Sequence, residues 1–94
     1  MDQTARIRAM EAILDEGTAA LDALETALDR WTALRPHLEE LAAYYEGPLW
    51  RQDFEADEAG QLPSGLKRGV LSEDAVYDLL AQQDRLREEL KELL

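Results

Sequence analysis

Apolar residues recur at alternating spacings of three and four along the first third of the chain. They run without a break as Ile7, Met10, Leu14, Gly17, Leu21, Leu24, Leu28 and Trp31. These spacings keep the side chains on one face of an α-helix and form a heptad seam typical of coiled coils. The intervening residues are mostly Ala, Glu, Asp and Arg, which favour a helix and suit its outer face. The pattern therefore predicts an amphipathic helix that needs a partner surface.

The same helix is expected to continue past Trp31 and to bend. Gly17 weakens it locally, but the seam keeps its phase there, so we expect one continuous helix. Beyond Trp31 the seam needs two consecutive spacings of three, beside Pro36, whose ring and missing N–H disturb a helix. The continued apolar positions are Leu34, Leu38, Leu41 and Tyr45. We predict a first helix over residues 1–46 with a bend near residues 33–36.

Turn residues divide the rest of the chain. Gly47 can take the left-handed position that ends a helix, and Pro48 suits the first turn of the next one. We therefore predict a short helix over residues 48–58, followed by a loop over residues 59–71. The apolar contacts of this short helix are Leu49, Trp50 and Phe54.

A last helix is expected over residues 72–94, with Ser72 as its N-cap. Its seam is Val76, Leu79, Gln83, Leu86, Leu90 and Leu93. All the aromatic residues lie between Trp31 and Tyr77, so we expect a dense core from this region with the last helix packed against it. The predicted fold class is all-α: a long kinked N-terminal helix, a short middle helix, a loop, and a C-terminal helix packed back as a helical hairpin or bundle. We treat residues 1–94 as a single helical domain.

Size and composition restrict the function classes. A chain of 94 residues makes one small domain whose core is marginal without a partner. The absence of Cys excludes disulfides and thiolate chemistry and fits a reducing compartment. Charges interrupt each apolar run near the N-terminus, so we expect no signal peptide, no membrane span and a cytoplasmic location.

The chain is strongly acidic, with 10 basic and 21 acidic residues and a formal net charge of -11. Such a surface repels phosphate backbones and anionic lipid headgroups, so we expect neither conventional nucleic-acid binding nor membrane binding. It also speeds the encounter with a basic protein. The simplest interpretation is an acidic solvated surface, and the alternative is a ligand of basic proteins.

Three sequence words in the second half of the chain are more distinctive than its helical flanks. They read YYEGPLWRQDFEADEAG from Tyr44, LPSGLKRGVLSED from Leu62, and AVYDLL from Ala75. With them the chain resembles the bacterial family catalogued as domain of unknown function 4298, along essentially its whole length. The resemblance implies a small, mostly helical bacterial protein and supplies no activity.

One dense carboxylate cluster is present, formed by Asp53, Glu55, Asp57 and Glu58. On a helix Asp53 and Asp57 share a face, and Asp53 and Glu58 do so less closely, so these three are the candidate ligands for a divalent ion. An EF-hand starting at Asp53 fails, because its sixth position is Glu58 instead of Gly and its twelfth is Ser64 instead of Glu. We therefore assign no metal site and favour a solvated face or ion pairs with Arg51, Lys67 and Arg68.

The other polar candidates have simpler structural roles. Lys67 and Arg68 precede the last helix, where N–H groups can receive an anion, but Glu73 and Asp74 already occupy that end. We expect the two cations to pair with nearby carboxylates. His37 is the single histidine and has neither Cys nor a second His to share a ligand or base role. We assign no catalytic residue and expect no cofactor.

Tyr44, Tyr45 and Trp50 can be interpreted in two ways. Aromatic side chains often line peptide or ligand grooves. A chain with only two Trp, three Tyr and one Phe needs them for its core, so we favour packing.

The sequence favours a non-catalytic, helix-mediated protein-interaction or accessory protein that can self-associate as a homodimer. The first seam exceeds what one short returning helix covers, so residues 76–93 or a second chain must cover it. The candidate contacts are Ile7, Met10, Leu14, Leu21, Leu24, Leu28 and Trp31. The alternative function is an acidic inhibitor or nucleic-acid mimic that binds a basic protein. A divalent-ion-binding protein or enzyme that uses the carboxylates of residues 53–58 is the third.

Overall fold

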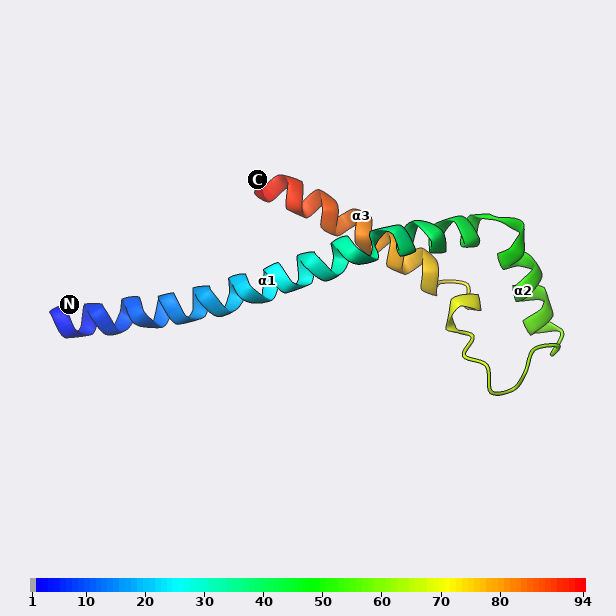
Figure 1. Cartoon of the computed structure of the whole chain (residues 1–94), viewed down its shortest axis with the longest axis horizontal. Helices are drawn as coiled ribbons and strands as arrows, with labels where there is room; N and C mark the ends of the chain where they lie inside the picture. Colours follow the sequence, from blue (N-terminus) through cyan, green and yellow to red (C-terminus); the bar gives the residue numbers. More distant parts are fainter. Residues whose placement is uncertain (1) are drawn as a thin grey trace. The chain divides into compact units, whose positions relative to one another are not determined.

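The computed structural model describes residues 2–94, and nearly all of its regular structure is α-helical. The elements follow the chain as α1 (Gln3–Glu46), α2 (Pro48–Glu58), the short 3-10 helix η1 (Gly69–Leu71) and α3 (Ala75–Leu93) (Figure 1). No strand occurs among these residues. The predicted all-α class, with a long first, a short middle and a C-terminal helix, is confirmed.

The chain forms two compact units, Met1–Pro36 and His37–Leu94. We call them the N-terminal unit and the C-terminal unit. Their border falls inside α1, so this one helix belongs to both. Contacts between residues are thus concentrated within each of two parts of the chain, whose residues 1–94 were expected to form a single domain.

The N-terminal unit is built from α1 alone. Asp2 begins the helix: its Oδ1 accepts a hydrogen bond from the Ala5 N–H at 2.7 Å, and its carbonyl accepts one from the Arg6 N–H at 3.0 Å. This is the geometry of an N-cap, which satisfies a free N–H group of the first turn. The helix then continues through both Gly17 and Pro36. The bend near residues 33–36 stays a prediction.

Gly47 joins α1 to α2 in a way that the sequence did not indicate. Its φ is -91° and its ψ is 176°, so it is extended and serves as the N-cap of α2, with Pro48 in the first turn. The prediction of a left-handed Gly47 is therefore wrong. A Cβ at this position would lie 3.1 Å from the Ala43 carbonyl oxygen, so close backbone approach is what favours glycine here.

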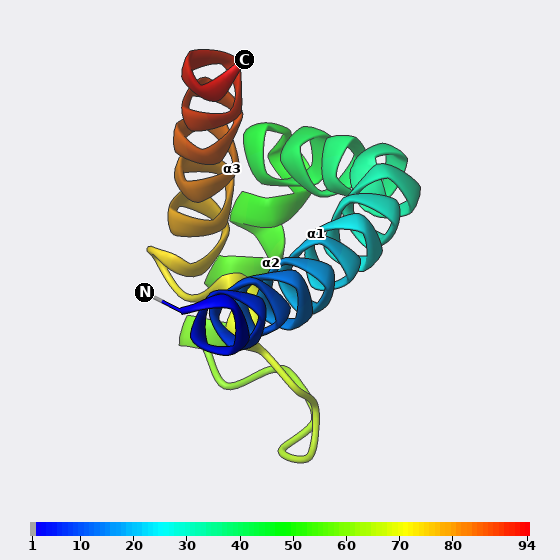
Figure 2. The same cartoon turned by 90° about the vertical axis from the view of Figure 1, so that its left-hand side faces the viewer.

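The left-handed glycine is instead Gly60, with a φ of 70°, just beyond the C-terminus of α2. The Gly60 N–H donates to the Asp57 carbonyl at 3.0 Å, and the Gln61 N–H donates to the Ala56 carbonyl at 2.9 Å. These two bonds form a Schellman motif, which satisfies carbonyls that the end of the helix leaves free. The loop that follows extends away from the helices of the C-terminal unit (Figures 1 and 2).

The last helix begins at Ala75, three residues later than the expected start at Ser72. Ser72 is extended, with a φ of -67° and a ψ of 150°, and it closes η1 through a hydrogen bond from its N–H to the Gly69 carbonyl. Its Oγ nevertheless accepts the Ala75 N–H at 3.2 Å. Ser72 thus accepts a hydrogen bond from the first helical residue, although it lies three residues before the helix and the N-cap position itself belongs to Asp74.

The core of the C-terminal unit lies around η1, which contacts both α2 and α3. Leu71 in η1 and Val76 in α3 are its buried apolar residues, and Trp50 of α2 donates its Nε1–H to the Val70 carbonyl at 2.9 Å. Four aromatic side chains of this unit, Tyr44, Tyr45, Trp50 and Phe54, are partly buried, whereas Tyr77 is 63% exposed. Both buried residues lie between residues 31 and 77, the region from which the core was expected, and Val76 belongs to the last helix, but the buried centre is aliphatic.

Candidate interaction surface

The apolar face of the N-terminal unit is the largest candidate site. We define the α1 seam as Ile7, Met10, Leu14, Gly17, Leu21, Leu24, Leu28 and Trp31. Its aliphatic members range in exposure from 38% for Leu28 to 67% for Leu21, and α1 contains no buried residue. From Ile7 to Trp31 the seam extends about 36 Å at 1.5 Å per residue.

Trp31, at the C-terminal end of the seam, has a different environment. It is half-buried, and the Arg35 guanidinium lies 5.2 Å from the centroid of its ring. Such a cation–π contact lets the aliphatic stem of Arg35 cover apolar surface while its charge stays in water. The exposed part of the seam is therefore the stretch from Ile7 to Leu28.

Ile13 also contributes to this surface, although it is not part of the predicted seam. It is 61% exposed and follows Met10 by three residues, so it widens the apolar face on one side. The helical spacing that reveals Ile13 is present in the sequence, because Ile13 lies three residues after Met10 and four residues before Gly17. A strict heptad pattern overlooks it, since it occupies a position beside the seam.

The candidate ion ligands of α2 have other partners. The Tyr44 hydroxyl donates to the Asp53 Oδ2 at 2.6 Å, and the Arg68 Nη1 lies 2.7 Å from the Asp57 Oδ1. Glu58 is exposed. Within residues 2–94 no group of three His, Cys, Asp or Glu residues is arranged to hold a metal ion. The Asp53 and Asp57 contacts instead tie α2 to the end of α1 and to the loop before η1.

The contact between Tyr44 and Asp53 perturbs the phenol. The pKa of Tyr44 is raised from 10.0 to about 12. Burial is the largest cause, and the hydrogen bond to Asp53 and the negative charge of that carboxylate are the others. Each cause disfavours a second negative charge beside the carboxylate. Tyr44 thus acts as a neutral hydrogen-bond donor, which suits a structural role.

The remaining polar candidates are Arg68, which is half-buried, and Lys67 and His37, which are exposed. Arg68 has the expected carboxylate partner, Asp57, whereas Lys67 is exposed and makes no ion pair with another described residue. The His37 Nδ1 lies 3.7 Å from the Glu40 Oε2, and both side chains are exposed. Neither arrangement places a base beside a nucleophile.

Aromatic packing accounts for the residues considered as a groove. The Tyr45 and Trp50 rings meet edge to face with centroids 5.3 Å apart, and Trp50 stacks on Phe54 at 5.2 Å. Because the Trp50 indole N–H is also bonded to the Val70 carbonyl, this cluster is fixed by its own contacts. These contacts favour packing over a binding groove.

No helix in residues 2–94 combines the length and the apolar character that crossing a membrane requires.

Comparison with known proteins places the chain in a family. Neither a curated protein nor a solved structure matches the chain. A family profile does match it, over residues 7–93, which include the α1 seam and all but the last residue of the C-terminal unit. The chain therefore belongs to the family described as Domain of unknown function (DUF4298).

Proposed function

We propose that this chain is a non-catalytic protein-interaction or accessory protein that docks a helix along the α1 seam. One observation carries the proposal: the N-terminal unit is a single helix whose aliphatic seam residues are all at least 38% exposed. No second element belongs to that unit among the residues described.

A single amphipathic helix of this kind lacks a surface against which to pack its apolar face. Isolated helices in water are marginal, and most helical stability in proteins comes from packing an amphipathic face. Five leucine and isoleucine side chains of the seam keep between 38% and 67% of their surface exposed. Complete burial of such a side chain from full exposure is worth about 1.5–3 kcal/mol, so each gains the corresponding fraction of that when it is covered. The heptad spacing suits knobs-into-holes packing against a second helix. A docked helix would therefore stabilise the N-terminal unit.

Site-specific photo-crosslinking tests the proposal directly. A photoreactive residue replaces either Leu21, in the seam, or Ala19, which lies on the opposite face and is also exposed. In the cells that produce the chain, we expect covalent adducts from position 21 and few from position 19. Equal yields from both positions, or none from either, would contradict docking along the seam.

Self-association is one form of this function, and light scattering tests it separately. A homodimer that depends on the seam is expected to dissociate in the Leu21→Glu and Leu24→Glu variants. Both positions are exposed, so the substitutions leave the buried centre of the C-terminal unit intact. A strict monomer at micromolar concentrations, unchanged by either substitution, would contradict the self-associating form.

An acidic ligand of basic proteins is the second candidate function. It is favoured by the run of α1 between Ala9 and Asp29, which contains no Lys or Arg. Its acidic residues are all exposed, and they are Glu11, Asp15, Glu16, Asp22, Glu25 and Asp29. A pure charge mimic would bind its partner with steep salt dependence and would tolerate Leu21→Glu.

A further inference from the structure

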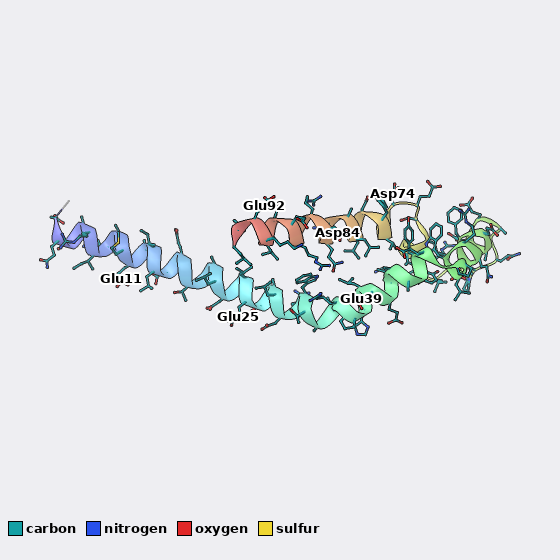
Figure 3. The ribbon with its side chains drawn as sticks, turned by 90° about the horizontal axis from the view of Figure 1, so that it is seen from above. Glu11, Glu25, Glu39, Asp74, Asp84 and Glu92 are labelled. Atoms are coloured by element: carbon teal, nitrogen blue, oxygen red, sulfur yellow. The ribbon has the colours of Figure 1, made fainter. Side chains whose placement is uncertain are left out.

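Charge is distributed unevenly around the α1 seam. On one side lies a row of carboxylates, which we call the acidic flank: Glu11, Asp15, Asp22, Glu25 and Asp29. On the other side lie mostly small or apolar residues, Ala9, Ile13, Ala20, Ala23 and Ala27, with Glu16 as the one carboxylate among them. Figure 3 marks Glu11 and Glu25 along α1, and by heptad position these two lie directly beside the seam.

The acidic flank has no counter-charge of its own. All five carboxylates are exposed, and none makes an ion pair within residues 2–94. Residues at heptad positions e and g contact the partner helix and set partner choice, so Glu11 and Glu25 are the two that face whatever docks. The side chains of a partner must therefore meet an apolar stripe with negative charge along one edge.

A second copy of the chain meets this edge poorly when it docks antiparallel in the register that overlaps the whole seam. A two-fold axis near Ala19 pairs Leu14 with Leu24 of the other copy, which is good packing. The same axis brings Glu11 toward Glu25 of the other copy, because e positions face each other in antiparallel pairs. Like charges in this arrangement are destabilising.

A parallel second copy is also unfavourable. It places Gly17 opposite Gly17, so one layer of the interface has no side chain from either helix. In this arrangement the acidic flank of one copy faces the opposite side of the other copy's seam. Arg6 facing Glu11 is then the one pair of opposite charges. Neither arrangement neutralises Glu25.

Resting on the proposed function, we propose that the α1 seam and the acidic flank together bind one class of partner: an amphipathic helix with Lys or Arg along the edge of its apolar stripe. The apolar stripe of such a helix covers the seam, and its cations lie beside Glu11 and Glu25. The seam supplies most of the affinity, and the flank selects the partner by charge.

Two designed helical peptides of about four heptads serve as probes. They share the same Leu and Ile seam, and one carries Lys at all e and g positions where the other carries Glu. Binding to the full chain is measured by fluorescence anisotropy at low and at moderate salt. Each exposed ion pair is worth about 1.5- to 5-fold in Kd, and Glu11 and Glu25 each attract the Lys peptide and repel the Glu peptide, so we expect the Lys peptide to bind at least about fivefold tighter at low salt.

A matched pair of variants separates local from overall charge. Glu11→Gln/Glu25→Gln removes two carboxylates from the acidic flank, whereas Glu39→Gln/Glu92→Gln removes two exposed carboxylates from the C-terminal unit (Figure 3). Both variants have the same net charge. We expect the first to lose about 2- to 25-fold in affinity for the Lys peptide and the second to bind as the parent chain does.

The remaining outcomes distinguish an error in the charge selection from an error in the docking along the seam. Equal binding of both peptides would overturn the charge selection and leave docking along the seam intact. Tight binding of the Lys peptide to the Leu21→Glu variant would show attraction by bulk charge and overturn the inference. If neither peptide binds but position 21 yields crosslinks, or if a Leu21-dependent homodimer forms, the partner class is wrong and the proposed function stands. No peptide binding, no crosslinks and no dimer would overturn both.

Discussion

The Arg68 guanidinium lies 2.7 Å from the Asp57 carboxylate and joins the loop before η1 to the C-terminal turns of α2. The two side chains are 37% and 27% exposed, so water weakens their attraction without abolishing it. We expect Arg68→Ala to lower the free energy of unfolding by about 0.5–1 kcal/mol. Urea denaturation followed by circular dichroism measures it, with Lys67→Ala as the control. An equal loss in the control would show that the ion pair contributes nothing specific.

Substitution of Tyr44 reports on the link between α1 and α2. Because the folded pKa of about 12 exceeds the unfolded value of 10.0, the hydroxyl contributes stability that is fully present below pH 10 and is lost as the pH rises toward 12. Ultraviolet titration of the folded chain is expected to show one tyrosine ionising near pH 12. Tyr44→Phe removes that component and costs about 1 kcal/mol of stability. Tyr77→Phe, at an exposed position, should leave the component in place.

Two glycines respond to alanine in opposite directions. Gly60 has a left-handed φ of 70°, so Gly60→Ala is expected to destabilise the C-terminal unit by about 1 kcal/mol. Gly17 lies inside α1 with open space around it, so Gly17→Ala should stabilise the helix there by about 0.8–1 kcal/mol. Urea denaturation measures the first effect, and amide hydrogen exchange around residue 17 measures the second. A gain at Gly60 would contradict the Schellman assignment.

The two buried aliphatic residues should dominate the stability of the C-terminal unit. Val76 is 2% exposed, and Val76→Ala is expected to cost about 2 kcal/mol through lost burial and a residual cavity. Val70 is 37% exposed, and its carbonyl still accepts the Trp50 N–H after substitution. Val70→Ala is therefore the matched control, with a loss below about 1 kcal/mol. Thermal unfolding of the two variants under one condition is the comparison, and similar midpoints would place the core elsewhere.

The sequence predicted well those features that depend on local spacing. The seam from Ile7 to Leu28 follows from helical periodicity, and the start of α2 follows from Pro48, because both are properties of neighbouring residues. Contacts between distant residues were not predictable. The Trp50 indole finds the Val70 carbonyl 20 positions away, and nothing in either local pattern specifies that bond.

The end of α2 shows how local hydrogen bonding decides between two glycines. The left-handed position was predicted at Gly47 alone, whereas the backbone hydrogen bonds at the end of α2 place it at Gly60. For the interaction surface, the seam was visible in the sequence. The importance of the acidic flank required knowing that its carboxylates find no ion-pair partner in residues 2–94.

The continuity of α1 across the border at Pro36 determines where the chain can be cut. Proteases cleave preferentially at exposed loop tips, and the border between the two units is helical on both sides. The longest non-helical stretch lies elsewhere, in the loop between Gly60 and Arg68. Limited proteolysis would therefore open the C-terminal unit within that loop and leave the two units joined by an intact α1.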